Sequence, residues 1–162
     1  MEEARGDAGL TVAERIAHAS NRVYDRVRSP RAGEAPERAR KGDLSALEGE
    51  KFVLVTTFKR SGDPVSTPMW FGLDSGRLYF RTYADAVKLK RIRNDPRVLV
   101  GPCAPRGKPK GEMVEARARV LPAADEEPAD RIVQSNYGLF RRIYKAGFSG
   151  RVEDAYVEVT PV

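Results

Sequence analysis

Three residues that can bind an anion lie close together after a predicted strand. Arg81 and Thr82 end the run Leu78–Tyr83, and Lys88 follows six residues after Thr82, in the first turn or so of the short basic segment Asp85–Asn94. A guanidinium, a hydroxyl and an ammonium group, together with the N–H groups of a helix start, are donors that hold a phosphate. This spacing predicts a phosphate-binding corner where a strand meets a helix. A capping role for Thr82 and a solvated Lys88 are the structural alternatives.

The neighbouring predicted strand, Val65–Leu73, contains an irregular stretch that could meet a ligand. Proline cannot donate a hydrogen bond to a sheet, so Pro68 requires either a bulge or an edge position, and we weigh the two equally. A bulge would free backbone N–H and C=O groups for a ligand. Such a stretch could lie along a planar ring, although Trp70 would equally suit the core. The residues concerned are Ser66, Thr67, Pro68, Met69 and Trp70.

Other chemistries find little support in the sequence. His18 is the only histidine and Cys103 the only cysteine, so neither a zinc site nor an internal disulfide is expected. Gly107-Lys108 lacks the glycine five residues earlier that a phosphate-binding P-loop requires. No nucleophile with a partner base is evident, so the catalytic residue is unknown. If the protein is an enzyme, we expect a bound cofactor to carry the chemistry and the protein to supply its seat.

Positive charge is concentrated in one part of the chain. The net charge is +6 at pH 7, and residues 58–110 hold twelve Lys or Arg against four Asp or Glu. Such a segment is either a solvated face or a surface for an anion: a phosphorylated cofactor, nucleic acid or an acidic membrane. Nucleic acid is disfavoured, because the aromatic residues between positions 70 and 83 alternate with core positions instead of forming an exposed platform.

The sequence predicts a cytoplasmic protein without a membrane span. No apolar run approaches the roughly 20 residues that cross a bilayer. The first ten residues are acidic and lack the apolar segment of a secretory signal. A single cysteine fits a reducing compartment.

Six strands are predicted from apolar runs bounded by turn residues. They are Phe52–Phe58, Val65–Leu73, Leu78–Tyr83, Arg97–Val100, Met113–Leu121 and Ala155–Val159. Helices are predicted at Thr11–Arg28, Asp85–Asn94 and Pro128–Ala146, the last with a candidate break near Tyr137-Gly138; a helical turn is predicted at Leu44–Gly49, and a turn at Pro122–Glu127. Short, closely spaced strands that outnumber the helices predict a mainly β (α+β) fold built on a small antiparallel barrel.

One domain with an N-terminal extension is expected from the length of 162 residues. Residues 1–42 would form the extension, with the amphipathic helix Thr11–Arg28 and a linker at Ser29–Lys41 that is rich in Pro, Gly and charge. Residues 43–162 would form the barrel that binds the cofactor. The narrow Val and Ala stripe of the helix favours packing on the barrel or on a second subunit over lying on a membrane.

A resemblance to a known superfamily rests on the stretch PVSTPMWFGLDSGRLYFRTYADAVKLKRIRNDPRVLVGPC and on the later Asn136-Tyr137-Gly138-Leu139. The chain resembles the pyridoxamine-5′-phosphate-oxidase-like split barrels, above all the branch that uses the deazaflavin coenzyme F420. The resemblance implies a six-stranded antiparallel split β-barrel of the FMN-binding type with flanking helices, and a homodimer with the cofactor at the subunit interface. It implies contacts to the ring and ribityl region from Ser66–Trp70, and to the phosphate from Arg81, Thr82 and Lys88.

The implied activity is hydride transfer from reduced F420 to a small unsaturated substrate. Flavin mononucleotide (FMN) would use the same phosphate corner, whereas F420 adds a lactyl-oligoglutamate tail whose exit should be lined by cations. The candidates for that exit are Lys59, Arg60, Arg91, Arg106, Lys108 and Lys110. The alternatives are an FMN-binding oxidase or reductase of the same fold, and a non-enzymatic protein that binds a coenzyme, haem or tetrapyrrole.

Overall fold

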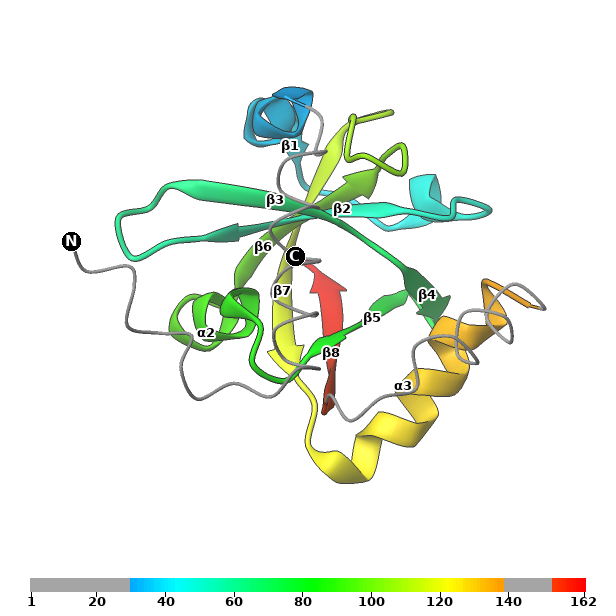
Figure 1. Cartoon of the computed structure of the whole chain (residues 1–162). Helices are drawn as coiled ribbons and strands as arrows, with labels where there is room; N and C mark the ends of the chain where they lie inside the picture. The colour runs from blue at the N-terminus through cyan, green and yellow to red at the C-terminus, as the bar shows by residue number, and fades with distance from the viewer. Residues whose placement is uncertain (1–29, 139–152) are drawn as a thin grey trace.

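A computed structural model describes residues 30–138 and 153–162 of the protein, and a single curled β-sheet lies at its centre (Figure 1). The strands are β1 (Ala39–Arg40), β2 (Val53–Phe58), β3 (Pro64–Met69), β4 (Phe71–Asp74), β5 (Arg77–Tyr83), β6 (Arg97–Pro102), β7 (Met113–Val120) and β8 (Asp154–Pro161). The helices are the 3-10 helices η1 (Pro30–Arg38) and η2 (Ser45–Leu47) and the α-helices α2 (Val87–Asn94) and α3 (Ala123–Ser135). The predicted helix Thr11–Arg28 lies outside the described residues.

The sheet has the order β3-β2-β6-β7-β8-β5-β4, and neighbours along this path are antiparallel. Among the described strands, β1 alone is parallel to its partner, β7. The predicted mainly β, antiparallel split barrel with flanking helices is therefore confirmed. The described part of the chain contains eight strands rather than the predicted six. The difference comes from a break in one predicted strand and from the added strand β1.

The break occurs at Trp70, inside the predicted strand Val65–Leu73. β3 pairs with β2, whereas β4 pairs with β5 on the opposite end of the sheet. One straight strand could not pair with both, so the chain changes direction between Met69 and Phe71. The pairing of β3 is regular through Pro68, which lies opposite Leu54. Of the two explanations offered for this proline, the edge strand is correct and the bulge is wrong.

The barrel interior is filled by the side chains on one face of this sheet. Residues that pair across strands share a face, as Val55 does with Val100 and Phe80 with Val157. Helix α2 adds Leu89 and Ile92 to the same core, and it packs against β2 and β7. Its observed range agrees closely with the predicted basic helix Asp85–Asn94. The position of α2 is fixed by these two buried side chains, while its basic residues stay near the surface.

Residues 30–40 are structured, which the sequence analysis did not expect of a linker at Ser29–Lys41. Ala32 and Ala35 of η1 are buried in a second cluster with Leu54 and Met113, on the outer face of β2 and β7. The alanines have no bulk that would keep η1 away from the sheet. The division into an extension and a barrel domain stays a prediction.

Helix α3 covers the outer face of β4, β5 and β8, where it buries Ala129 and Val133. Close packing there depends on Gly72 of β4, because a Cβ at this position would lie 2.2 Å from the carbonyl oxygen of Ile132. The glycine thus sets how near the helix can lie to the sheet.

The start of α3 differs from the prediction. The helix begins at Ala123, so most of the predicted turn Pro122–Glu127 is helical, and Pro128 lies inside the helix instead of at its start. Pro128 leaves the carbonyl of Ala124 without a helical donor. Because Ala124 is exposed, water can satisfy that carbonyl. The helix ends at Ser135, and the rest of the predicted extension to Ala146 falls partly outside the described residues.

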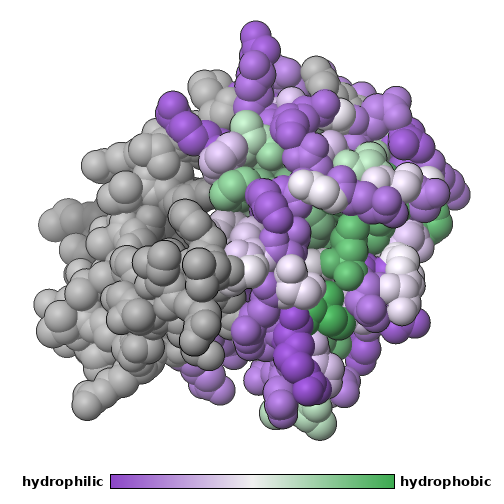
Figure 2. All heavy atoms as spheres, turned by 90° about the vertical axis from the view of Figure 1, so that its right-hand side faces the viewer, coloured by the Kyte–Doolittle hydropathy of each residue, from purple (hydrophilic) through white to green (hydrophobic). Residues whose placement is uncertain are grey.

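The surface is mainly polar where the structure describes it. Figure 2 shows one face on which hydrophilic side chains predominate around a short hydrophobic strip. Among the described residues, Val87 and Val162 are the large hydrophobic side chains that are mostly exposed, at 57% and 59%. None of the described helices is long and apolar enough to cross a membrane.

Candidate functional site

Among the described residues, two sheet edges near α2 have no partner strand. β3 pairs with β2 on one side only, and β4 covers β5 only from Arg77 to Phe80. Within the described residues, Arg81–Tyr83 therefore have no partner strand on the side that β4 leaves. Figure 1 shows β3 and β5 diverging from β4, with α2 near their open ends. We call the region between these two edges the split; its backbone N–H and C=O groups are not used by the sheet.

Two of the three predicted phosphate-binding residues meet at the split. The Nζ of Lys88, on α2, lies 3.4 Å from Oγ1 of Thr82, on β5. Thr82 is 8% exposed and lies opposite Ala155, so it belongs to the inward face of the barrel. The strand supplies the hydroxyl, and the helix that follows it supplies the cation. The structure thus joins these two residues as the spacing predicted.

Arg81 extends from the opposite face of the same strand. It lies across from Tyr156 of β8, and its Nε is 3.4 Å from a carboxylate oxygen of Asp154. Successive side chains of a strand alternate between faces, so adjacent Arg81 and Thr82 point apart. The structure does not bring the guanidinium of Arg81 to Thr82 and Lys88.

The stretch Ser66–Trp70, predicted to contact the cofactor ring, is likewise divided between the two faces of the sheet. Thr67 and Met69 lie opposite Val55 and Val53 and therefore face the barrel interior beside the split. Ser66 turns to the other face, where its Oγ is 2.8 Å from Oγ1 of Thr56 in a buried hydrogen bond. The structure therefore places Thr67 and Met69 on the side of the split and engages Ser66 in the barrel wall.

Pro68 and Trp70 have different neighbours. Pro68 lies under the β6–β7 connection, so that a Cβ added to Gly107 would be 3.3 Å from the Pro68 ring. Trp70, between β3 and β4, is partly exposed and stacks on Tyr137, with ring centroids 4.7 Å apart and ring planes 19° apart.

A basic pocket of about 240 Å³ lies between the C-terminal half of α2 and the end of β2. Arg91 on its wall donates a hydrogen bond of 3.5 Å to Oγ1 of inward-facing Thr57. No carboxylate lines the pocket among the described residues; the lining residues are Phe58, Arg60, Lys90, Arg91 and Asn94. An anion would therefore enter it without meeting like charge.

Of the six cations predicted to line the exit of the F420 tail, two line this pocket: Arg60 and Arg91. Arg106, Lys108 and Lys110 lie instead on the β6–β7 connection, where Lys110 pairs with Glu50 at 2.6 Å. Lys59 is exposed and does not line the pocket. Lys90 and Asn94 were missed, although their four-residue spacing on a predicted helix places them on one face.

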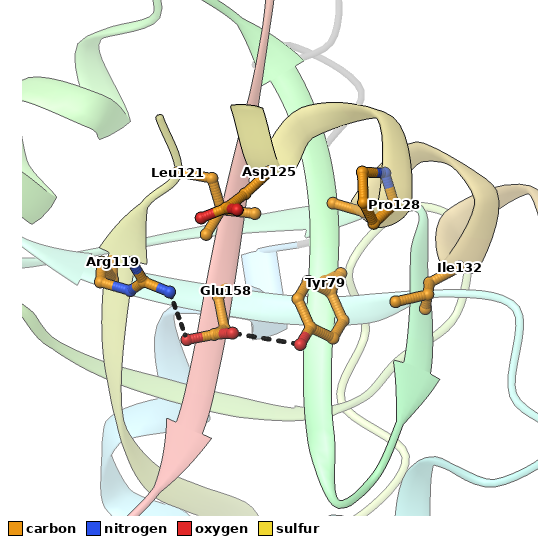
Figure 3. Close-up of a pocket in the computed structure, with 8 residues that line it drawn as sticks. Tyr79, Arg119, Leu121, Asp125, Pro128, Ile132 and Glu158 are labelled. Atoms are coloured by element: carbon orange, nitrogen blue, oxygen red, sulfur yellow. Dashed lines mark hydrogen bonds and ion pairs between the residues drawn. The ribbon is translucent and has the colours of Figure 1, made fainter. Parts of the chain in front are cut away.

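A second pocket, of about 270 Å³, lies on the outer face of the sheet beneath α3 (Figure 3). At its floor Glu158 accepts hydrogen bonds from Tyr79 and Arg119, both at 3.1 Å, and it pairs with Arg77 at 3.2 Å. Burial would raise the pKa of Glu158, but these hydrogen bonds and the two guanidinium groups hold it below its usual value. Both carboxylate oxygens are engaged, and this pocket lies across the sheet from Thr82.

Metal or thiolate chemistry has no support in the part of the chain that the structure describes. No three His, Cys, Asp or Glu residues there gather closely enough to bind a metal ion. Cys103 is buried, and that burial raises the pKa of its thiol to about 12. A thiol with that pKa stays protonated at neutral pH and is a poor nucleophile.

The family model described as pyridoxamine 5′-phosphate oxidase matches residues 43–151. The chain belongs to this family. No curated protein matches the sequence.

Solved structures share the fold of this family member at low identity. The heme storage protein HutZ from Vibrio cholerae is 15% identical over 71% of this chain and 84% of its own, with a TM-score of 0.53. An FMN-binding, pyridoxamine 5′-phosphate oxidase-related protein from Nostoc punctiforme is 14% identical over 72% and 77%, with a TM-score of 0.51. A FAD-binding protein from Mesorhizobium loti is 17% identical over 75% and 92%, with a TM-score of 0.52. At these identities the likeness concerns the fold alone.

Proposed function

We propose that this member of the pyridoxamine 5′-phosphate oxidase family is an F420-dependent oxidoreductase that binds its cofactor in the split. The observation that carries the proposal is the approach of Lys88 Nζ to 3.4 Å from Thr82 Oγ1 between two sheet edges that lack partner strands. Bound reduced deazaflavin would supply a hydride to a small unsaturated substrate, with a proton from solvent completing the reduction.

The phosphate of the cofactor would lie between Lys88 and Thr82. Lys88 provides a positively charged N–H donor and Thr82 a hydroxyl, and a charge-assisted hydrogen bond is stronger than a neutral one. The low exposure of Thr82, 8%, keeps water from competing for that hydroxyl. Arg81 would join them only by leaving Asp154, so we assign it a smaller part than Lys88 and Thr82.

The ring of the cofactor would lie along β3. This strand offers the backbone groups of an edge to which the described residues add no strand, and Thr67 and Met69 present their side chains on the inward face. A flavin-type ring carries both hydrogen-bonding heteroatoms at its rim and an apolar face, which these two kinds of group complement. Trp70 would meet the ring where β3 ends.

The basic pocket beside α2 favours F420 over FMN. Arg91 lies three residues after Lys88, so both project from neighbouring turns of one helix. A ligand whose phosphate is held at Lys88 can therefore extend along α2 toward Arg60 and Arg91. FMN has no charged group beyond its phosphate, whereas the carboxylates of the F420 tail match a pocket without acidic residues.

FMN is the second candidate, because the Lys88–Thr82 pair does not distinguish one phosphate monoester from another anionic phosphate. An FMN-binding oxidase or reductase of the same fold would need the phosphate corner but not Arg60. The two candidates therefore differ in their dependence on the basic pocket.

The test is a fluorescence titration of the purified full-length protein with F420 and with FMN. We expect Lys88→Ala to weaken F420 binding about 10- to 150-fold, which corresponds to the loss of a charge-assisted hydrogen bond of about 1.5–3 kcal/mol. Arg60→Ala should weaken the binding of F420 and leave that of FMN unchanged. Arg81→Ala should have a smaller effect than Lys88→Ala.

The matched control is Arg93→Ala, which removes the same charge from an exposed position of the same helix. A general effect of the positive charge on α2 would give equal losses in Lys88→Ala and Arg93→Ala. Either that result or an unchanged dissociation constant in Lys88→Ala contradicts the proposed site. Tight FMN binding that is unchanged in Arg60→Ala would support the second candidate.

A further inference from the structure

Asn136 and Tyr137, the two residues that follow α3, tie together two distant parts of the chain. The hydroxyl of Tyr137 accepts a 2.9 Å hydrogen bond from the N–H of Phe71 and donates one to the carbonyl of Lys51. The side-chain amide of Asn136 donates to the carbonyls of Glu50 and Phe71, at 3.0 and 3.1 Å. Lys51 Nζ in turn donates to the side-chain and backbone oxygens of Asn136. We call these two residues the 136–137 clamp.

The clamp fixes the backbone on the C-terminal side of Trp70. Both the N–H and the C=O of Phe71 are bound by it, and that N–H belongs to the peptide group that joins Trp70 to Phe71. Burial raises the pKa of Tyr137 to about 12, so its hydroxyl keeps its proton at neutral pH and can accept and donate at once. The two bonds of this hydroxyl therefore persist across the physiological range of pH.

The clamp also fixes the side chain of Trp70. The Tyr137 ring stacks on the indole at 4.7 Å between centroids, and Lys51 Nζ lies 5.8 Å from the centroid of the same tyrosine ring. Stacked aromatic pairs stabilise each other by about 0.5–1.5 kcal/mol beyond the area they bury. Trp70 is thus held in two ways: the Tyr137 ring covers one face of the indole, and the backbone that follows it is hydrogen-bonded at Phe71.

Trp70 lies where β3 ends and β4 begins, at the point where the split closes. The pairing of β4 with β5 begins at Phe71 and Phe80, so the chain leaves β5 at the level of Arg81, where the edge of β5 becomes unpaired. On the other side, Met69 is still paired with β2. Trp70 is partly exposed and lies at this junction, where the split closes.

We infer that Asn136 and Tyr137 are positioning residues, which hold Trp70 as the wall against which a planar aromatic ring lies. The inference rests on the proposed function, since the ring belongs to the flavin-type cofactor. Preorganising an aromatic wall lowers the entropy lost when a ring binds, so the clamp contributes to affinity without touching the ligand. A clamp that serves only to dock α3 would stabilise the fold and leave ring binding unaffected.

The experiment uses the fluorescence of Trp70, which is the only tryptophan of the chain. In Tyr137→Ala we expect red-shifted emission, lower anisotropy of Trp70 and about 5- to 10-fold weaker binding of F420, the scale of a lost aromatic stack and its hydrogen bonds. Tyr137→Phe keeps the stack and removes the hydroxyl, so its effects should be smaller. Asn136→Ala removes the other half of the clamp, and it tests the inference if Tyr137→Ala fails to fold.

The matched control is Tyr156→Phe. It removes the 2.6 Å hydrogen bond from Tyr156 to Asp130 of α3, and so weakens the docking of this helix without touching Trp70. We expect lower stability with unchanged emission and unchanged binding. If the clamp variants behave like Tyr156→Phe, the clamp only docks the helix and the inference is wrong.

The outcome separates this inference from the proposed function. If the wild-type protein binds neither F420 nor FMN, the proposed function fails. If it binds F420 with quenching of Trp70, and the folded clamp variants alter neither that quenching nor the affinity, then only the role of Asn136 and Tyr137 is refuted. Changed emission together with weaker binding supports both.

Discussion

At the scale of single residues, Cys103 couples the stability of the protein to alkaline pH. Burial, and next the nearby charge of Glu50, raise the pKa of this thiol from its ordinary value of 9.0 to about 12. Below pH 9 the folded and unfolded states both hold the proton. Above it, the unfolded state loses its proton first, so stability falls as the pH rises toward 12.

We therefore expect the free energy of unfolding of the wild type to fall by about 2 kcal/mol more than that of Cys103→Ala between pH 8 and pH 10.5. Tyrosines that do not interact with Cys103 contribute equally in both proteins, so the difference reports the thiol together with its interaction with Tyr137. Urea unfolding under reducing conditions at the two pH values measures it. Parallel losses in the two proteins would show that Cys103 is not the source.

The sequence identified most of the candidate site residues but not which way their side chains point. Lys88 and Thr82 meet because a strand ends where a helix begins, and this juxtaposition follows from spacing alone. The separation of Arg81 from Thr82 follows from the alternation of adjacent strand residues, which the prediction of a shared phosphate corner did not apply to this pair. Only the strand register shows that Arg81 lies beside Tyr156 on the outer face. Ser66 likewise bonds Thr56 of a neighbouring strand. A contact between strands depends on register, and residue type alone does not fix it.

At the scale of elements, the distance between α3 and the sheet depends on Gly72. A Cβ there would lie 2.2 Å from the carbonyl oxygen of Ile132 and 2.8 Å from the backbone nitrogen of Val133. These are backbone atoms of a helix, so they cannot move aside alone. Any side chain at position 72 has to push α3 outward.

We expect Gly72→Ala to lower the free energy of unfolding by about 2–3 kcal/mol, the upper part of the range for overpacked sites. The control is Gly33→Ala in η1, where an added Cβ would meet nothing within 4 Å. Urea denaturation of both variants compares them. Equal stability of the two would mean that α3 is not packed as closely as described.

Several strands and helices could be predicted from hydrophobic periodicity. The others depend on contacts with distant parts of the chain, which periodicity does not reveal. The alternation of Val114, Ala116 and Ala118 gave β7 correctly, because these residues all face the core. The break at Trp70 arises because the two halves of one apolar run pair with different strands. The charged run at residues 30–40 folds because Ala32 and Ala35 find a surface on the barrel. Such tertiary partners leave no periodic signal.

At the scale of the whole molecule, we expect the protein to be a homodimer. The edges of β3 and of Arg81–Tyr83 lack partner strands within the described residues, and unpaired edges are sites of association unless they are covered. A second copy at the split would cover them and would enclose a bound cofactor between two subunits.

Light scattering at micromolar concentration should give a mass of about 36 kDa, twice the 18.0 kDa of the chain. The mass should stay the same in Lys88→Ala, which removes a ligand contact rather than a strand. A mass of 18.0 kDa would mean that the cofactor site belongs to one subunit alone.

The position of β8 has a consequence for how the chain is made. This strand, Asp154–Pro161, lies between β5 and β7 and pairs with both, although it follows them by many residues. While a ribosome is still adding the preceding segments, the two halves of the sheet have no strand to join them. The nascent protein would thus expose the apolar side chains of its interior until β8 has emerged from the exit tunnel, and such exposed apolar surface and unpaired strand edges favour aggregation.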